Sequence, residues 1–153
     1  MDLMTVLSPD LIALHLTGTT KDEIISQLVD VAMASGNVSD KEEAIASVQE
    51  RESRMSTGMK HGIAIPHGKT AAVKDLVACI GVSDHEVDFD ALDHQGCRIF
   101  IMTLSPLEKT GPHLQFLAEV SMLFRSEEKR QAILNAKTPE EILDILKPQP
   151  LDN

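Results

Sequence analysis

The stretch RIFIMTLS at residues 98–105 decides the expected fold, because it is a nearly continuous apolar run of strand length. A second run of the same kind, LVACIGVS, occupies residues 76–83. Strands with one solvated face alternate apolar and polar residues, whereas strands that are covered on both faces stay apolar along their length. These two segments therefore predict central strands of a sheet with helices on both faces.

Shorter strand-like segments lie on either side of these two runs. Residues 11–16 and 62–65 are apolar and short, and we expect each of them to form a strand. Residues 87–93 alternate polar and apolar side chains before Gly96, which is typical of a hairpin or an edge piece. The segments together predict a mixed, mostly parallel sheet of about five strands.

Capping boxes mark the expected helices. In a capping box a Ser or Thr side chain accepts from the third helical N–H, and a Glu three residues later reaches back. Three pairs have this spacing, namely Thr20 and Glu23, Ser39 and Glu42, and Thr138 and Glu141. Gly36 can end the first helix in the left-handed conformation, and Pro112 and Ser126 predict two more helix starts. Helices thus cluster at both ends of the chain.

These elements predict an α/β fold, a three-layer sandwich in which helices flank the mixed sheet. A length of 153 residues fits one domain, and no repeat, low-complexity tract or linker divides it. We therefore expect a single domain over residues 1–153, with an ordered core over about residues 9–147 and loose ends at residues 1–8 and 148–153.

The net charge of the chain argues against two classes of binding partner. A formal net charge of −10 repels the phosphates of nucleic acids and anionic lipids, so neither a nucleic acid nor a membrane surface is the expected partner. No apolar run reaches the roughly 18 residues that span a bilayer, and the N-terminus lacks a signal-peptide pattern. We expect a cytoplasmic protein in which Cys79 and Cys97, each inside an apolar run, are buried reduced thiols.

His67 is the candidate reactive residue, because Pro66 should end the strand at residues 62–65. Proline fixes its own φ and lacks an N–H, so we expect His67 at a strand tip, where open α/β sheets form ligand sites. Gly68 removes a side chain from the approach to the imidazole. A neutral imidazole is nucleophilic and titrates at about pH 6.5, so it can accept and release a phosphoryl group.

Four further residues are candidates for the same site. His113 lies in the first turn of the helix that Pro112 should start, where the dipole disfavours imidazolium and a neutral ring can hold a phosphoryl oxygen; the alternative is a solvent-facing histidine. Arg51 offers a planar fork for phosphate oxygens, the alternative being a solvated charge. Ser56 and Thr57 offer hydroxyl and N–H groups. The remaining histidines lack comparable settings and are expected to be structural or exposed: His15, His61, His85 and His94.

Other classes of chemistry lack their motifs. No His-x-x-x-His helix and no Cys-x-x-Cys pair occurs, which argues against a metal hydrolase and leads us to expect no metal ion. A Gly-x-Ser-x-Gly elbow and a Walker phosphate loop are also missing, so we expect no nucleotide or other cofactor. The phosphoryl donor is then expected to be another protein.

The pattern Arg51-Glu52, Ser56-Thr57-Gly58 and GIAIPHGK at residues 62–69, followed by Pro112-His113-Leu114, resembles a known family. It resembles the mannitol/fructose-type IIA component (type-2 IIA) of the bacterial phosphoenolpyruvate-dependent sugar phosphotransferase system, over nearly the whole chain. The resemblance implies that His67 accepts a phosphoryl group on Nε2, as a tele-phosphohistidine, from the phosphohistidine of the carrier HPr. A IIB component would then take the group and feed a membrane IIC permease, with fructose or mannitol as the expected class of sugar.

The resemblance also assigns roles to the neighbouring residues. It implies that His113 supports the phosphoryl group or the His67 ring, and that Arg51 offsets the phosphoryl charge with Ser56 and Thr57 nearby. Relatives in a regulatory, nitrogen-related branch commonly have a second Arg soon after the Arg-Glu pair, where this chain has Ser53-Arg54, so the role of Arg54 stays open. In that branch, phosphorylation of the same histidine controls the binding of partner proteins. The sequence is compatible with both branches.

Overall fold

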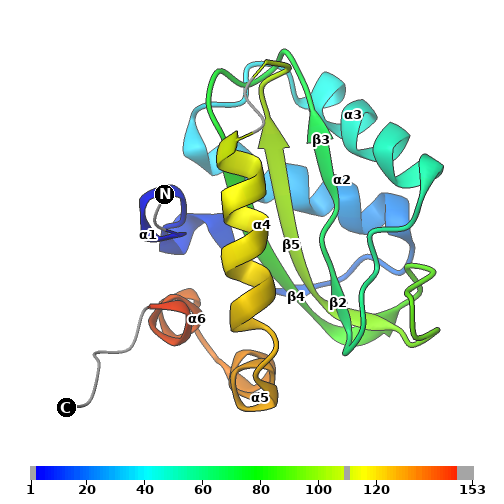
Figure 1. The fold of residues 1–153 in the computed structure, drawn as a ribbon, viewed down its shortest axis with the longest axis vertical. Coiled ribbons are helices and arrows are strands. Elements are labelled where there is room, and N and C mark those ends of the chain that lie inside the picture. Colours follow the sequence, from blue (N-terminus) through cyan, green and yellow to red (C-terminus); the bar gives the residue numbers. More distant parts are fainter. Residues whose placement is uncertain (1–2, 109–110, 148–153) are drawn as a thin grey trace.

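A computed structural model of the protein describes residues 3–108 and 111–147, and a five-stranded mixed sheet lies at its centre (Figure 1). The sheet has the order β1-β4-β5-β2, and β3 follows β2 along the same side of β5. The β4–β5 pair is antiparallel and the other pairs are parallel, which confirms the mixed, mostly parallel sheet. The strands are β1 (Ile12–Leu16), β2 (Ile63–Ala64), β3 (His67–Lys69), β4 (Val77–Val87) and β5 (Cys97–Ser105).

Helices cover both faces of the sheet, as the three-layer prediction requires. In Figure 1, α4 crosses one face in front of β5, while α2 and α3 lie behind the sheet. Residues of α5 and α6 join α4 in the core on its face of the sheet. The helices are α1 (Leu3–Val6), α2 (Lys21–Ala32), α3 (Lys41–Arg54), α4 (Gly111–Leu123), α5 (Glu127–Asn135) and α6 (Pro139–Leu146), with 3-10 turns η1 (Pro9–Leu11) and η2 (Met33–Ser35).

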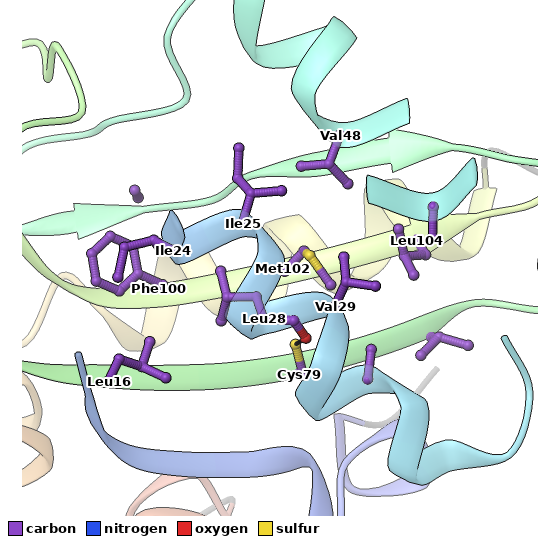
Figure 2. Close-up of a cluster of buried hydrophobic side chains, with 14 of the residues drawn as sticks. Leu16, Ile24, Ile25, Leu28, Val29, Val48, Cys79, Phe100, Met102 and Leu104 are labelled. Carbon is purple, nitrogen blue, oxygen red and sulfur yellow. Dashed lines mark hydrogen bonds between the residues drawn. The ribbon is translucent and has the colours of Figure 1, made fainter. Parts of the chain in front are cut away.

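A core of buried apolar side chains lies on each face of the sheet, and β5 contributes to both. This explains why its sequence does not alternate between apolar and polar residues. Successive side chains of a strand point to opposite faces. Phe100, Met102 and Leu104 pack against α2 and α3, as Figure 2 shows, whereas Ile99 and Ile101 belong to the core beneath α4. Each face thus receives every second residue of one strand.

Two of the three predicted capping boxes are confirmed, and the third is displaced by one residue. Thr20 and Thr138 accept from the backbone N–H groups three residues ahead. Helix α3, however, is capped by Asp40, whose carboxylate accepts from the N–H of Glu43, so the predicted cap at Ser39 is wrong. The Ser39 hydroxyl instead donates to the carbonyl of Ala72 at 3.1 Å. Asp is as good an N-cap as Ser. Because the Ser39 hydroxyl is bound to Ala72, Asp40 caps the helix instead.

The structure also tests the predictions for the chain ends, for residues 87–93 and for the two cysteines. Leu7, within a predicted loose end, is only 5% exposed and packs in the core beneath α4; residues 148–153, the other predicted loose end, lie outside the described residues. In the 87–93 segment, Val87 ends β4 and pairs with Cys97, whereas residues 88–93 form no strand and belong to the connection to β5, so the predicted hairpin or edge piece is wrong for them. Cys79 and Cys97 are free and buried, as predicted. Within residues 3–108 and 111–147, no helix is both long and apolar enough to cross a membrane.

Candidate functional site

Strand β2 ends at Ala64, before Pro66, as predicted, but His67 does not lie past the tip of the last strand, because it begins strand β3. Pro66 has no N–H to offer β5, which interrupts the sheet between β2 and β3. Its carbonyl still accepts from the N–H of Thr103 at 3.3 Å, and His67 then pairs with Thr103 in parallel register. His67 therefore lies on an outer strand of the sheet. Its partner Thr103 is two residues before the end of β5 at Ser105.

The backbone determines which nitrogen of His67 is reactive. Nδ1 lies 2.9 Å from the carbonyl oxygen of Ile65, and because a carbonyl only accepts, Nδ1 must carry the proton and donate. In the neutral ring Nε2 then holds the lone pair. Burial lowers the pKa of His67, the bond to Ile65 opposes this, and the positive charge of Arg51 lowers it further. His67 is thus a neutral imidazole with a nucleophilic Nε2 at neutral pH.

His113 is the neighbour of His67 in space. It lies in the first turn of α4 as predicted, is 7% exposed, and its ring centroid is 4.9 Å from that of His67. This burial rules out the solvent-facing alternative. Desolvation, together with the charges of His67 and Lys69, lowers the pKa of His113 to about 4. The site therefore holds two imidazoles that are both neutral near pH 7.

A cavity of about 590 Å³ opens beside the two histidines, between α3 and β3. Arg51, Arg54 and Lys69 line it, so its cationic side chains suit an anion such as a phosphoryl group. Arg51 donates from Nη1 to the carbonyl of Met55 at 2.8 Å, and Arg54 is paired with Glu50 at 2.7 Å. The remaining lining residues are Glu43, Ala46, Ser47, Glu50, His67, Gly68 and His113.

Gly68 allows α3 to approach β3 this closely. A Cβ at Gly68 would lie 2.5 Å from Oγ of Ser47 and 2.9 Å from the backbone of Ser47 and Val48. Gly68 is buried beneath α3, so its missing side chain makes room for the helix, and it also lines the cavity beside the His67 imidazole. This contact brings Arg51, one turn further along α3, to the cavity.

The structure does not bring Ser56 and Thr57 to the cavity. The Ser56 hydroxyl donates to the carbonyl of Phe89 and accepts from the N–H of Gly58. Thr57 is 5% exposed, and both its N–H and its hydroxyl donate to the carboxylate of Glu52. Their polar groups therefore secure the segment that follows α3, and neither residue lines the cavity.

Sequence reasoning missed a partly buried ion pair that holds this segment. Glu52, 6% exposed, lies 3.1 Å from Nζ of Lys21, which also contacts Asp90 at 3.0 Å. Glu52 stands beside Arg51 in the quoted pattern, but nothing in the sequence links it to a lysine 31 residues earlier. The lining role of Lys69 was missed as well, although its position two residues after His67 in a strand places both side chains on one face.

The other four histidines lie outside the cavity and are exposed, as predicted: His15, His61, His85 and His94. Nδ1 of His15 is 2.8 Å from Asp84, and Nε2 of His85 is 3.0 Å from the carbonyl of Gly18. In the part of the chain that the structure describes, no group of three or more His, Cys, Asp or Glu side chains could hold a metal ion.

A family model and the sequences of known proteins were compared with this chain, and both match the same family. The family model "Phosphoenolpyruvate-dependent sugar phosphotransferase system, EIIA 2" matches residues 5–149. The PTS system fructose-specific EIIA component of Haloferax volcanii is 34% identical, over 95% of this chain and 94% of its own. The fructose-specific EIIABC component of Bacillus subtilis is 32% identical over 95% of this chain, which spans only 23% of that longer protein.

Solved structures share the fold. The nitrogen regulatory protein IIA-Ntr of Neisseria meningitidis superposes with a TM-score of 0.86 at 25% identity, over 94% of this chain and 97% of that chain. The mannitol enzyme IIA of Escherichia coli, solved in complex with phosphorylated enzyme IIB, superposes with a TM-score of 0.78 at 20% identity, over 92% and 96%. At that identity the second likeness shows the fold alone.

Proposed function

Because the chain belongs to the EIIA 2 family of the phosphoenolpyruvate-dependent sugar phosphotransferase system, we propose that it is a phosphoryl carrier whose acceptor is Nε2 of His67. In this proposal residues 1–153 act as one IIA domain in the cytoplasm. His67 takes the phosphoryl group from the phosphohistidine of HPr and becomes a tele-phosphohistidine. A IIB component then takes the group, for uptake of a fructose- or mannitol-class sugar through a membrane IIC permease.

The hydrogen bond from Nδ1 of His67 to the Ile65 carbonyl is the observation that carries this proposal. As the Nε2–P bond forms and the N–P bond of the donor breaks, the lone pair of Nε2 enters the new bond and the His67 ring becomes positively charged. The Nδ1–H group is then a stronger donor, and the fixed carbonyl stabilises the charge without any reorganisation. The same bond keeps the phosphoryl group on Nε2 and off Nδ1.

Arg51 and His113 stabilise the phosphoryl group in this proposal. Phosphoryl transfer depends on positioning and on charge stabilisation around the equatorial oxygens. The guanidinium of Arg51 lines the cavity beside His67, and the buried neutral ring of His113 lies against His67. Arg54, held by Glu50, adds positive charge at the same cavity. Ser56 and Thr57 are left out of the phosphoryl contacts, because their hydroxyls are bonded elsewhere.

The relatives support a IIB component as acceptor and leave a second function open. The mannitol IIA neighbour was captured with phosphorylated IIB, and the relative from Haloferax volcanii is named fructose-specific. The regulatory alternative is favoured by the TM-score of 0.86 with IIA-Ntr. In that case the phosphorylation state of His67 would control the binding of another protein, through the negative charge that it adds.

Incubation with labelled phosphoenolpyruvate, Enzyme I and HPr tests the proposal. We expect one acid-labile, base-stable label on the wild-type chain, none on His67→Ala, and full labelling of the exposed control His94→Ala. Label that persists on His67→Ala would overturn the proposal. Mixing the labelled protein with purified fructose- and mannitol-type IIB proteins then separates the two functions: label moves to a IIB protein in the uptake role and stays in place in the regulatory one.

A further inference from the structure

One residue of β5 contacts both histidines of the site. Thr103 is 1% exposed and pairs through its backbone with His67. Its side chain reaches the other ring, because Oγ1 lies 2.9 Å from Nδ1 of His113. Paired residues of neighbouring strands present their side chains on the same face, so the Thr103 side chain lies on the same face of the sheet as the His67 ring.

This hydrogen bond can be made in two ways, with opposite consequences for the cavity. In one, the Thr103 hydroxyl donates to Nδ1 of His113, so the proton of the neutral ring is on Nε2. In the other, Nδ1–H donates to Oγ1, so Nε2 carries a lone pair. The first makes His113 a donor towards the cavity, and the second makes it an acceptor.

Burial favours the first arrangement. Among the described residues, His113 is the hydrogen-bond partner of the Thr103 hydroxyl. If Nδ1–H were the donor, the proton of the buried hydroxyl would have no acceptor among the residues that the structure describes, which is costly. If the hydroxyl donates, both its proton and the lone pair of Nδ1 are satisfied.

We propose that Thr103 is a positioning residue, whose hydroxyl holds His113 as the Nε2–H tautomer and so makes it a hydrogen-bond donor to a phosphoryl group on His67. This inference rests on the proposed function of His67. It adds the reason why a neutral His113 can bind a phosphoryl group on His67. A lone pair on Nε2 of His113 would repel the phosphoryl oxygens, whereas an Nε2–H group attracts them. The tautomer is selected before any phosphoryl group arrives.

Nitrogen-15 NMR of the histidine rings in the unphosphorylated protein tests the inference, because it reports which ring nitrogen carries the proton. We expect His113 as Nε2–H in the wild type and in Thr103→Ser, which keeps the hydroxyl. Thr103→Val, of nearly the same shape, should show a mixture of tautomers. The control Thr70→Val removes another hydroxyl of a buried threonine, one that accepts from the Ala72 N–H, and should leave His113 unchanged.

Two outcomes would overturn the inference: an Nδ1–H tautomer of His113 in the wild type, or the same tautomer in Thr103→Val as in the wild type. Phosphoryl transfer to IIB supplies a second readout, and we expect Thr103→Val to be about tenfold slower, with Thr103→Ser close to the wild type. Equal slowing of both variants would reduce Thr103 to a packing role. Failure of His67 to accept label would overturn the proposed function, and with it the role of His113 as a donor to a phosphoryl group. The NMR measurement needs no phosphoryl group, so it would still decide whether Thr103 selects the tautomer.

Discussion

Lowering the pH from 8 to 5 should destabilise the fold through His113. Its pKa is about 4 in the folded protein, whereas an exposed histidine in the unfolded chain has its ordinary pKa of about 6.5. Between these values the unfolded state binds more protons than the folded state, so stability falls as the pH falls through 6.5 towards 4. At pH 5 the unfolded ring is largely protonated while the folded ring is not, which corresponds to a loss of about 2 kcal/mol.

Urea denaturation of the wild type and of His113→Gln at the two pH values isolates this contribution. Far-UV circular dichroism is the suitable signal, because the chain contains neither Trp nor Tyr. Carboxylates and the four exposed histidines titrate in both proteins, so their effects largely cancel in the comparison. We expect the wild type to lose about 2 kcal/mol more than His113→Gln between pH 8 and pH 5.

Equal losses in the two proteins would refute the reasoning, because they would mean that His113 titrates alike in the folded and unfolded states. A proton-bound His113 in the folded protein at pH 6, seen by NMR, would refute it as well. Either result would show that burial does not lower the pKa of His113.

Three further outcomes are expected. Gly68→Ala should destabilise the protein by about 1–3 kcal/mol in urea, because its Cβ would lie 2.5 Å from Oγ of Ser47; a loss below a few tenths would show that α3 moves aside freely. Arg51→Gln should accept phosphoryl groups from HPr about tenfold more slowly or worse, and unchanged rapid-quench kinetics would return Arg51 to a solvated charge. Asp40→Ala should cost about 1 kcal/mol of thermal stability, and a larger loss in Ser39→Ala would contradict the assignment of the cap.

The sheet, the helices and both histidines could be predicted because each depends on local sequence. The apolar run of β5 requires two covered faces, and a helix start beside Pro112 required only the backbone preferences of proline. His67 stood out by its neighbours Pro66 and Gly68. The predictions that failed concern features that depend on tertiary pairing. Strand β3 forms directly after Pro66 because its backbone pairs with β5.

The interior polar network was beyond the reach of sequence for the same reason. Ser56 and Thr57 have the right chemistry for a phosphoryl group, but their hydroxyls are bound by partners brought in from elsewhere, the carbonyl of Phe89 and the buried carboxylate of Glu52. Glu52 in turn requires Lys21 from α2. No periodicity or motif records such contacts, since each depends on how α2 and α3 pack on the sheet.

The position of the phosphoryl group on the His67 ring tests the central claim most directly. After phosphorylation by HPr, the phosphorus–nitrogen coupling in NMR of ¹⁵N-labelled protein identifies the nitrogen that carries the group. The bond from Nδ1 to the Ile65 carbonyl predicts a phosphoryl group on Nε2 of His67, with the Nδ1 proton still present. A phosphoryl group on Nδ1, or on any other histidine, would contradict the account.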